Sequence, residues 1–230
     1  GKYISYTEER HITMNQFRIH QEEMHVEKTG FLKNLVLLIW KGTQGTVTKT
    51  EDRLVENVIT DYYAAYFNGF DGFTPMQRED LRKSLAIDER NRDGNREESE
   101  QERNSRIECM IDEMERRRKE LKVEELSFNS FYEYSVQGIP DICHENHISG
   151  IDLSTYRYMM KDFYRGGNHE KTLNENMDSS LFDETFVVFE IDSIKDDPLL
   201  FPLVTLIIMD VFLQKMRIKK NRKVLVIEEA

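Results

Sequence analysis

The apolar positions divide the chain into two strand-like ends and a long helical middle. Residues 2–6 and 12–17 are rich in β-branched and aromatic side chains and flank a charged turn, so they are predicted to form two short strands of a hairpin. From residue 21 to residue 166 the apolar side chains recur mainly at helical spacing, as they do at every fourth position from Leu54 to Tyr66. This middle region is expected to be almost entirely helical.

Start and stop signals place several of these helices. The first is expected to end at Gly42, because glycine adopts the backbone conformation that commonly terminates a helix. Thr48, followed three residues later by Glu51, has the spacing of a capping box, in which each side chain bonds the backbone N–H group of the other residue. Ser127 is expected to cap a short helix through Tyr134, and Pro140 is expected to break the helical pattern, because proline lacks the N–H group of a helical bond.

One stretch of the middle region lacks the helical pattern. Residues 88–106 are almost all polar or charged, and Gly94 lies among them. A segment of this composition buries too little apolar surface to order itself, so a flexible stretch or a frayed helix end is expected. Order should return at the apolar stripe that includes Ile107, Ile111 and Met114.

The last third of the chain has the parts of a parallel βαβ unit. Residues 185–191 are predicted to form a buried strand. A helix that begins at Pro198 or at Pro202 follows, and it is apolar on nearly every face through Leu213, so it should be covered on more than one side. Residues 224–227 are predicted to form a second strand, parallel to the first.

Composition excludes several classes of protein. The net charge of −11 argues against a surface that binds nucleic acid throughout, although local basic patches such as the one from Lys215 to Lys223 remain open. Two cysteines far apart fit a reducing cytosol better than a disulfide scaffold. The longest apolar runs, residues 31–40 and 199–213, are shorter than the roughly 20 residues of a membrane-spanning helix. A soluble, cytoplasmic protein is expected.

The paired acids after the last predicted strand are the candidate chemical site. In open parallel sheets ligands bind beyond the carboxyl ends of the strands, so acids there face a bound nucleotide, as in a Walker B motif. Glu228 is expected to hold Mg²⁺ through water, and Glu229 to orient or deprotonate the attacking water as the catalytic residue. An ordinary strand end followed by acids is the alternative.

Other groupings do not add to this site. Cys143, His144 and His147 lack a fourth ligand at a suitable spacing, so no metal site is predicted. No loop that ends in Gly-Lys-Ser or Gly-Lys-Thr occurs in the 230 residues, so the chain by itself is not expected to hydrolyse ATP or to carry a cofactor. Because an apolar strand is followed by only three residues, the chain is expected to be a fragment.

The order of segments resembles the stretch between Walker A and Walker B in conjugation ATPases of the TraG class, relatives of the large type IV secretion ATPases. Gln16 stands where the family commonly has proline, Glu228 stands where it usually has aspartate, and residues 88–106 have no counterpart. Five segments in the same order carry the resemblance: residues 12–17, residues 48–66, residues 163–167 with 180–183, residues 186–192, and residues 224–230.

The resemblance implies an α/β fold, with a partial RecA-like P-loop NTPase core and a large all-α insertion. Residues 1–20 and 168–230 would form the core, and residues 21–167 the inserted helical domain. The whole protein would use ATP and Mg²⁺ and assemble as a homohexamer with other secretion-channel subunits, peripheral to the inner membrane. It would couple hydrolysis to type IV secretion or DNA transfer in bacterial conjugation, as for a conjugative transposon.

Two other functions are compatible with the sequence. The chain could be a non-enzymatic helical docking module whose acidic surface binds other secretion components. It could also belong to a DNA-pumping, helicase-like motor, whose hydrolysis DNA would stimulate.

Overall fold

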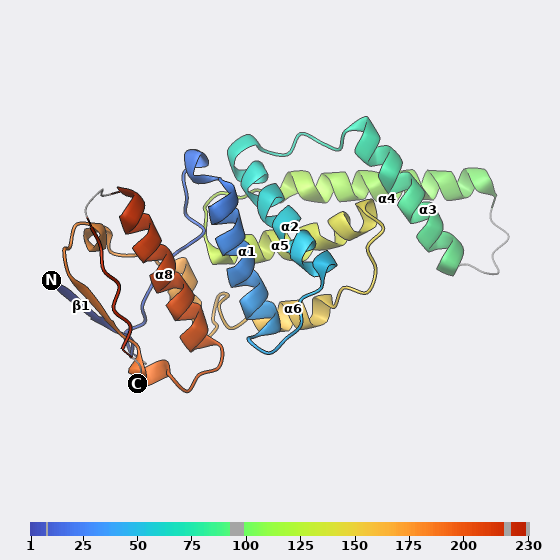
Figure 1. The fold of residues 1–230 in the computed structure, drawn as a ribbon. Helices are drawn as coiled ribbons and strands as arrows, with labels where there is room; N and C mark the ends of the chain where they lie inside the picture. Colours follow the sequence, from blue (N-terminus) through green and yellow to red (C-terminus); the bar gives the residue numbers. More distant parts are fainter. Residues whose placement is uncertain (8, 93–98, 219–221, 229–230) are drawn as a thin grey trace. The chain divides into compact units, whose positions relative to one another are not determined.

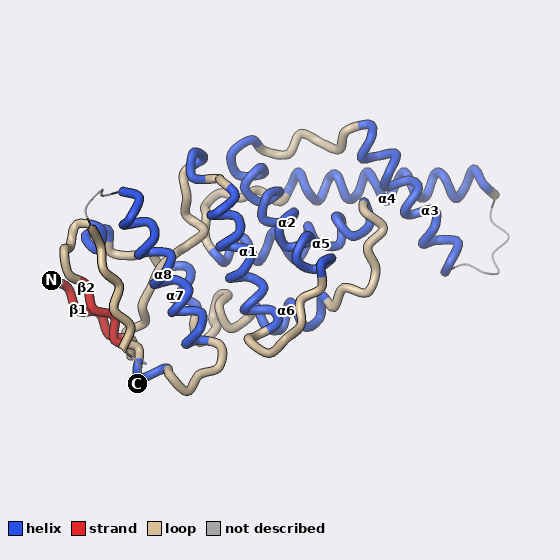
Figure 2. Tube along the Cα trace, in the orientation of Figure 1, coloured by secondary structure: helices blue, strands red, loops and turns tan. Residues whose placement is uncertain are grey.

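The computed structural model describes residues 1–7, 9–92, 99–218 and 222–228. The chain folds into two compact units, which are described separately. The first unit contains residues 1–48, 127–129 and 154–230, and the second contains residues 49–126 and 130–153. Most of the described residues are helical (Figures 1 and 2).

The sheet of the first unit is a pair of parallel strands from opposite ends of the chain. Strand β1 (Lys2–Ser5) pairs with β2 (Val187–Glu190), with Lys2 opposite Val187. A backbone hydrogen bond of 2.9 Å from Tyr6 to Glu190 continues the ladder. Both strands lie where they were predicted, but the predicted hairpin is wrong. The two strands are parallel, and parallel strands cannot be joined by a short turn. The partner of β1 therefore comes from a distant part of the sequence.

Residues 12–17, the other half of the predicted hairpin, are irregular. The backbone N–H of Met14 donates to the carbonyl of Thr172 at 2.8 Å, and that of Asn15 donates to the carbonyl of Glu175 at 2.9 Å. The apolar side chains of this segment, including Phe17, are buried. The β-branched and aromatic composition of residues 12–17 therefore indicated burial correctly. Their backbone forms hydrogen bonds with the region of α7 and not with a neighbouring strand.

The first unit is completed by helices around this buried segment. Its α-helices are α1 (Val26–Lys41), α6 (Leu153–Met160), α7 (Glu170–Asn174) and α8 (Leu200–Ile218), and its short 3₁₀ turns are η1 (Gln21–Glu23), η2 (Ser179–Phe182) and η3 (Asp192–Ile194). Gly42 ends α1 with a φ of +67°, as predicted. The Asp197 carboxylate accepts from the backbone N–H groups of Leu199 and Leu200 at 2.9 and 2.7 Å, and so begins α8 between the two predicted prolines.

A buried ion pair joins α1 to α8. The ammonium of Lys28 lies 3.1 Å from the carboxylate of Asp210 and donates at 2.9 Å to the amide oxygen of Gln16. Gln214 donates to the same carboxylate of Asp210. Both charged residues are only 8 % exposed. Burial lowers the pKa of Lys28, while Asp210 acts in the opposite direction. Nothing in the local sequence pattern predicted this pair.

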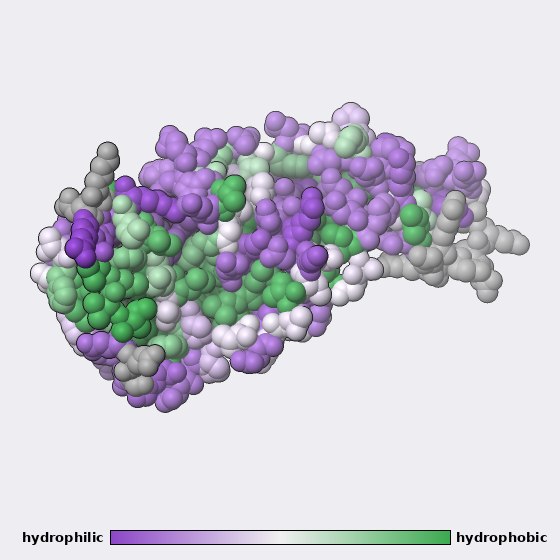
Figure 3. All heavy atoms as spheres, viewed as in Figure 1, coloured by the Kyte–Doolittle hydropathy of each residue, from purple (hydrophilic) through white to green (hydrophobic). Residues whose placement is uncertain are grey.

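The last described segment differs from its prediction. Residues 222–228 form no strand, so the predicted strand at residues 224–227 is wrong for this structure. Val224, Val226 and Ile227 are each more than 70 % exposed, and Figure 3 shows an extensive hydrophobic area on this part of the first unit. A strand needs a neighbour for its backbone groups, and within the described ranges only β1 and β2 form a sheet.

The second unit is an all-helical bundle. It contains α2 (Lys49–Asn68), α3 (Pro75–Arg92), α4 (Glu100–Glu120) and most of α5 (Phe128–Glu145). The predicted apolar face of α2 is buried at Leu54, Val58 and Tyr62. The Tyr62 ring meets the ring of Phe131 edge to face, with their centroids 5.4 Å apart.

Helix α5 runs through Pro140, so the predicted end of this helix is wrong. Proline removes one backbone bond of a helix. Ile139 and Ile142, on either side of it, are buried in the described structure. Burial of apolar side chains on both flanks stabilises the helix enough to offset the missing bond.

Helices α3 and α4 form a hairpin with an apolar core of its own. The buried members of this core are Phe73, Leu81, Leu85, Ile107, Ile111 and Met114. The flexible segment expected at residues 88–106 is largely helical: α3 continues to Arg92, and a capping box of Ser99 with Glu102 begins α4. Arg106 on α4 forms an ion pair with Glu89 on α3. Residues 93–98 lie outside the described ranges.

The compact units do not have the same bounds as the expected domains. Helix α1 lies with the strands in the first unit, whereas the expected inserted domain begins at residue 21. Residues 154–167 also lie in the first unit. The expected domain boundaries stay a prediction, because compact units and inserted domains need not coincide.

Candidate functional site

The carboxyl edge of the sheet brings together residues that are far apart in the sequence. β1 ends at Ser5 beside the end of β2 at Glu190. The hydroxyl of Ser193, just after β2, donates to the carbonyl of Tyr6, just after β1. In open parallel sheets this edge is where ligands bind, because the loops beyond the strand ends leave a crevice there.

An aromatic and imidazole cluster lies next to this edge. We call Tyr6, His11, His169 and Thr172 the edge cluster. The Tyr6 and His11 rings are stacked with their centroids 5.1 Å apart, and the His11 and His169 rings are 6.0 Å apart. Tyr6 and Thr172 are buried, and His169 precedes α7, whose first turn carries Thr172.

Each member of the edge cluster has a buried polar atom without a hydrogen bond among the described residues. These atoms are the Tyr6 hydroxyl, Nδ1 of His11, Nδ1 of His169 and Oγ1 of Thr172. The Tyr6 and Thr172 hydroxyls lie near each other without reaching the geometry of a hydrogen bond. An unsatisfied buried polar group costs about 1–3 kcal/mol. A site with four such atoms has the polar lining that an ordered water requires.

Burial favours the neutral forms of Tyr6 and His169. It raises the pKa of Tyr6, and the nearby carboxylate of Asp197 raises it further. It lowers the pKa of His169, and the neighbouring His11 acts in the same direction. Asp197 and Asp162 oppose the shift of His169. At pH 7 Tyr6 and His169 therefore offer neutral hydrogen-bonding groups within the edge cluster.

We expect the edge cluster to make stability depend on pH. The pKa of His169 is lower in the folded chain than its ordinary value of 6.5, so the unfolded chain binds a proton first as pH falls. The free energy of unfolding should therefore decrease below pH 6.5, by up to about 1.4 kcal/mol per pH unit for one proton. Urea unfolding between pH 7.5 and 5.5 measures this slope.

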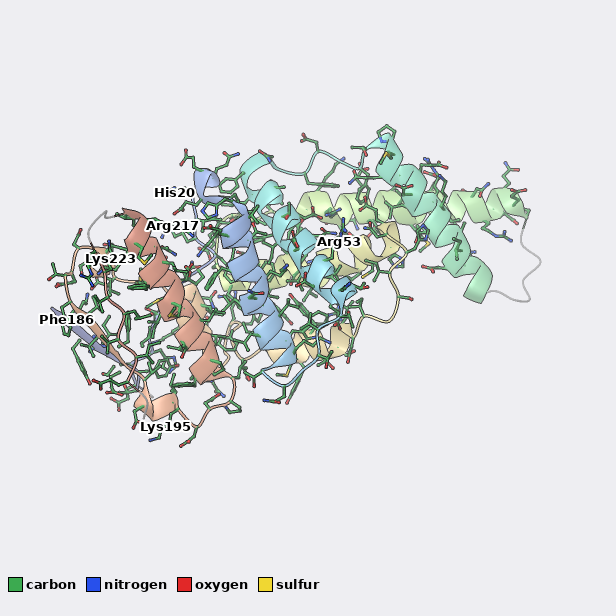
Figure 4. All side chains as sticks on the ribbon, viewed as in Figure 1. His20, Arg53, Phe186, Lys195, Arg217 and Lys223 are labelled. Atoms are coloured by element: carbon green, nitrogen blue, oxygen red, sulfur yellow. The ribbon has the colours of Figure 1, made fainter. Side chains whose placement is uncertain are left out.

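A matched pair of variants isolates the contribution of His169. His169→Gln should flatten the slope, whereas His20→Gln, at an exposed position of the same unit (Figure 4), should leave it unchanged. An equal slope in wild type and His169→Gln would show that His169 titrates alike in the folded and unfolded chain.

The acids predicted from the sequence are not assembled with the edge cluster. Glu228 is exposed in the irregular segment 222–228, and Glu229 lies outside the described residues. In the view of Figure 1 this segment runs in the direction opposite to α8 and in the same direction as β1. The roles predicted for both acids stay predictions.

Metal-ligating groupings do not occur in the part of the chain that the structure describes: no three His, Cys, Asp or Glu residues are placed to hold an ion. Burial raises the pKa of Cys143 to about 11, so its thiol is protonated at neutral pH and is a poor ligand. Nδ1 of His144 lies 3.2 Å from the carboxylate of Asp88.

Sequence reasoning missed the edge cluster because Tyr6 and His11 lie more than 150 positions before His169 and Thr172. Tyr6 lies within a predicted strand, and His11 borders another, so each fits an ordinary structural role. A single sequence offers no signal that would pair them with His169.

Comparison with protein families shows to which family this chain is related. The model of the TraG P-loop domain matches residues 1–91 and 66–230, which together span the sequence. The chain belongs to the TraG P-loop domain family. The resemblance drawn from the order of segments is thereby confirmed. The two matches overlap at residues 66–91, which include the first residues of the stretch 88–106 that has no counterpart in that resemblance.

Membership in the TraG P-loop domain family relates the chain to conjugative transfer ATPases. Comparison with curated proteins and with solved structures gives no match. The fold is mainly helical with one parallel pair of strands, which is consistent with the family. Each helix in the described ranges is too short or too polar to cross a membrane.

Proposed function

We propose that this TraG P-loop domain chain is part of a conjugative transfer ATPase that couples ATP hydrolysis to type IV secretion or DNA transfer. The family match carries the proposal. The parallel pairing of β1 with β2, followed by α8 and an apolar segment that leads to Glu228 and Glu229, supports it.

The proposed fold of the whole ATPase core is RecA-like. Residues 224–227 are a continuous apolar run, as expected of a strand buried on both faces of a parallel sheet. Their exposed side chains in this structure are consistent with a strand that takes its place only in a larger sheet. Helix α8 would then be the crossover between β2 and this strand.

The two acids have complementary proposed roles. Carboxylate oxygens are ligands that Mg²⁺ prefers, so Glu228 and Glu229 fit the ion by donor type. Glu228 would hold Mg²⁺ through water, and its side chain reaches further than the usual aspartate. Glu229 would orient the attacking water and accept its proton. Bound Mg²⁺ would neutralise charge on the phosphates of ATP.

The 230 residues contain no loop that ends in Gly-Lys-Ser or Gly-Lys-Thr. We therefore propose that phosphate binding requires residues outside this sequence, and that these 230 residues alone do not hydrolyse ATP. The complete ATPase would form a homohexamer with other secretion-channel subunits, in the cytoplasm and peripheral to the inner membrane.

Hydrolysis by the product of the whole gene tests this proposal. Glu229→Gln should lower kcat by about 100-fold or more, because a positioned general base contributes at least this much. Glu22→Gln removes one exposed carboxylate in η1 and should leave kcat unchanged. Wild-type activity in Glu229→Gln would contradict the proposed site.

DNA in the same assay separates the two kinds of motor. Stimulation of hydrolysis by DNA would favour a DNA-pumping motor, whereas a secretion ATPase need not respond. If the folded product of the whole gene showed no Mg²⁺-dependent hydrolysis, the result would reject the ATPase and favour the non-enzymatic docking function. The separate apolar core of the α3–α4 hairpin favours such a role for the helical part.

A further inference from the structure

A polar pocket in the first unit lies away from the carboxyl edge of the sheet. Its volume is about 180 Å³, and it is enclosed by the segment around Gln16, the N-terminal end of α1 and the C-terminal half of α8. The start of α8 lies near Tyr6, since the charge of Asp197 acts on that residue. Arg217 is 17 residues beyond Leu200, about 25 Å along the helix at 1.5 Å per residue.

The floor of the pocket is hydrogen-bonded and charge-balanced. Lys28, Asp210 and Gln16 all line it, and they are held by the buried ion pair described above. Asp210 accepts hydrogen bonds from both Lys28 and Gln214. Its negative charge is therefore compensated within the floor and does not set the charge of the pocket.

The other charged side chains of the lining include one arginine without a partner among the described residues. Arg18 and Arg217 line the pocket, and Glu23 is the one further acid in its wall. Arg217 forms an ion pair with Glu27, and the carboxylate of Glu23 accepts from the backbone N–H of His20 at 2.6 Å. Arg18 is exposed and has no ion pair or hydrogen bond with any described residue. A free guanidinium thus faces a pocket in a chain whose net charge is −11.

His25 adds a directed donor to the same wall. Its Nδ1 accepts from the backbone N–H of Lys28 at 3.3 Å, which caps α1. A neutral imidazole whose Nδ1 accepts carries its proton on Nε2, so Nε2–H remains available to donate. The positive end of the α1 dipole lies at the same place.

We propose that this pocket binds a small oxyanion, a phosphate or a carboxylate group, with Arg18 as its main ligand and His25 and Arg217 beside it. A guanidinium suits both anions because its planar fork donates two parallel hydrogen bonds to two oxygens. The volume is sufficient for one such group. The inference is independent of the proposed ATPase function, since it uses none of the residues assigned to hydrolysis.

Backbone amide NMR of the 230-residue chain tests the site. Sodium phosphate and sodium acetate are titrated separately against sodium chloride at constant ionic strength. We expect saturable shifts at Gln16, His25 and Gln214 with at least one of the two anions. Saturation by phosphate alone assigns the pocket to a phosphate group, and saturation by acetate identifies a carboxylate ligand.

Two arginine variants provide the matched comparison. Arg18→Gln should weaken the saturable binding about 10-fold, the loss expected when one charged hydrogen-bonding group is removed. Arg53→Gln changes an exposed arginine on α2 that has no partner among the described residues, and it should leave binding unchanged (Figure 4). Equal affinity in Arg18→Gln and wild type, or shifts with both anions that match those of chloride, would overturn the proposal.

Discussion

Lys28→Met should lower the free energy of unfolding by about 3–5 kcal/mol, the cost of removing one partner from a buried ion pair. The substitution keeps a side chain of similar length, so little packing volume is lost. It leaves the carboxylate of Asp210 and the amide oxygen of Gln16 without their donor from Lys28 in a buried place. Urea unfolding followed by circular dichroism measures the difference.

The double variant Lys28→Met/Asp210→Leu should recover most of this loss. Burial lowers the pKa of Lys28 even though Asp210 is adjacent, so desolvation outweighs attraction for this pair. Replacing both charges by apolar side chains removes that penalty, and such replacements are often neutral or stabilising. We expect the double variant to lie between Lys28→Met and wild type, because the amides of Gln16 and Gln214 still lose the partners that Lys28 and Asp210 provide.

A surface ion pair provides the control for these two variants. Lys195 pairs with Asp192 at 2.9 Å, and both side chains are about half exposed (Figure 4). Lys195→Met should therefore lower the free energy of unfolding far less than Lys28→Met does. The interpretation would fail if Lys28→Met were as mild as Lys195→Met, or if the double variant were as unstable as Lys28→Met.

Among substitutions in the second unit, Arg118→Met should lower the free energy of unfolding the most, by about 3 kcal/mol. The guanidinium of Arg118 donates at 2.9 Å to the carboxylate of Asp61 and lies over the rings of Phe70 and Phe73, at 5.1 and 5.5 Å from their centroids. It thereby connects α4 to α2 and to the loop before α3. Cation–π attraction and ion pairing are lost together in the variant.

The pH dependence of the Arg118→Met variant distinguishes lost charge from lost packing. Burial raises the pKa of Asp61 and of Asp141, while Arg118 opposes both shifts. Without Arg118 these pKa values rise further, so the folded variant binds protons before the unfolded chain does. The difference in free energy of unfolding between wild type and Arg118→Met should therefore be smaller at pH 4.5 than at pH 7.

Arg116 is the matched control on the same helix. It forms exposed ion pairs with Glu113 and Glu120, so Arg116→Met should lower the free energy of unfolding far less than Arg118→Met does. A deficit of Arg118→Met that is the same at pH 4.5 and pH 7 would assign the effect to packing of Phe70 and Phe73 alone.

The sequence by itself determined the local elements and the relationship of this protein. Periodic apolar positions located α2 and both strands of the sheet, and Gly42 marked the end of α1, because these features depend on neighbours within a few residues. The order of five segments indicated the TraG class, which the family comparison confirmed. Glu228 and Glu229 were likewise candidates from their place after an apolar run.

Tertiary structure decided which distant segments meet. The parallel partner of β1 lies more than 180 residues away, and the buried partner of Lys28 lies at position 210. The edge cluster and the oxyanion pocket combine residues from both ends of the chain. Such contacts depend on the packing of whole elements, and no local periodicity encodes them.

The same reason explains the wrong local predictions. Residues 12–17 had a strand-like composition but took their hydrogen bonds from the region of α7, and α5 continued through Pro140 because both flanks are buried. Residues 224–227 had the composition of a strand but no neighbouring strand in the described sheet. Composition specifies how strongly a segment favours burial, and long-range partners determine the backbone conformation in which it is buried.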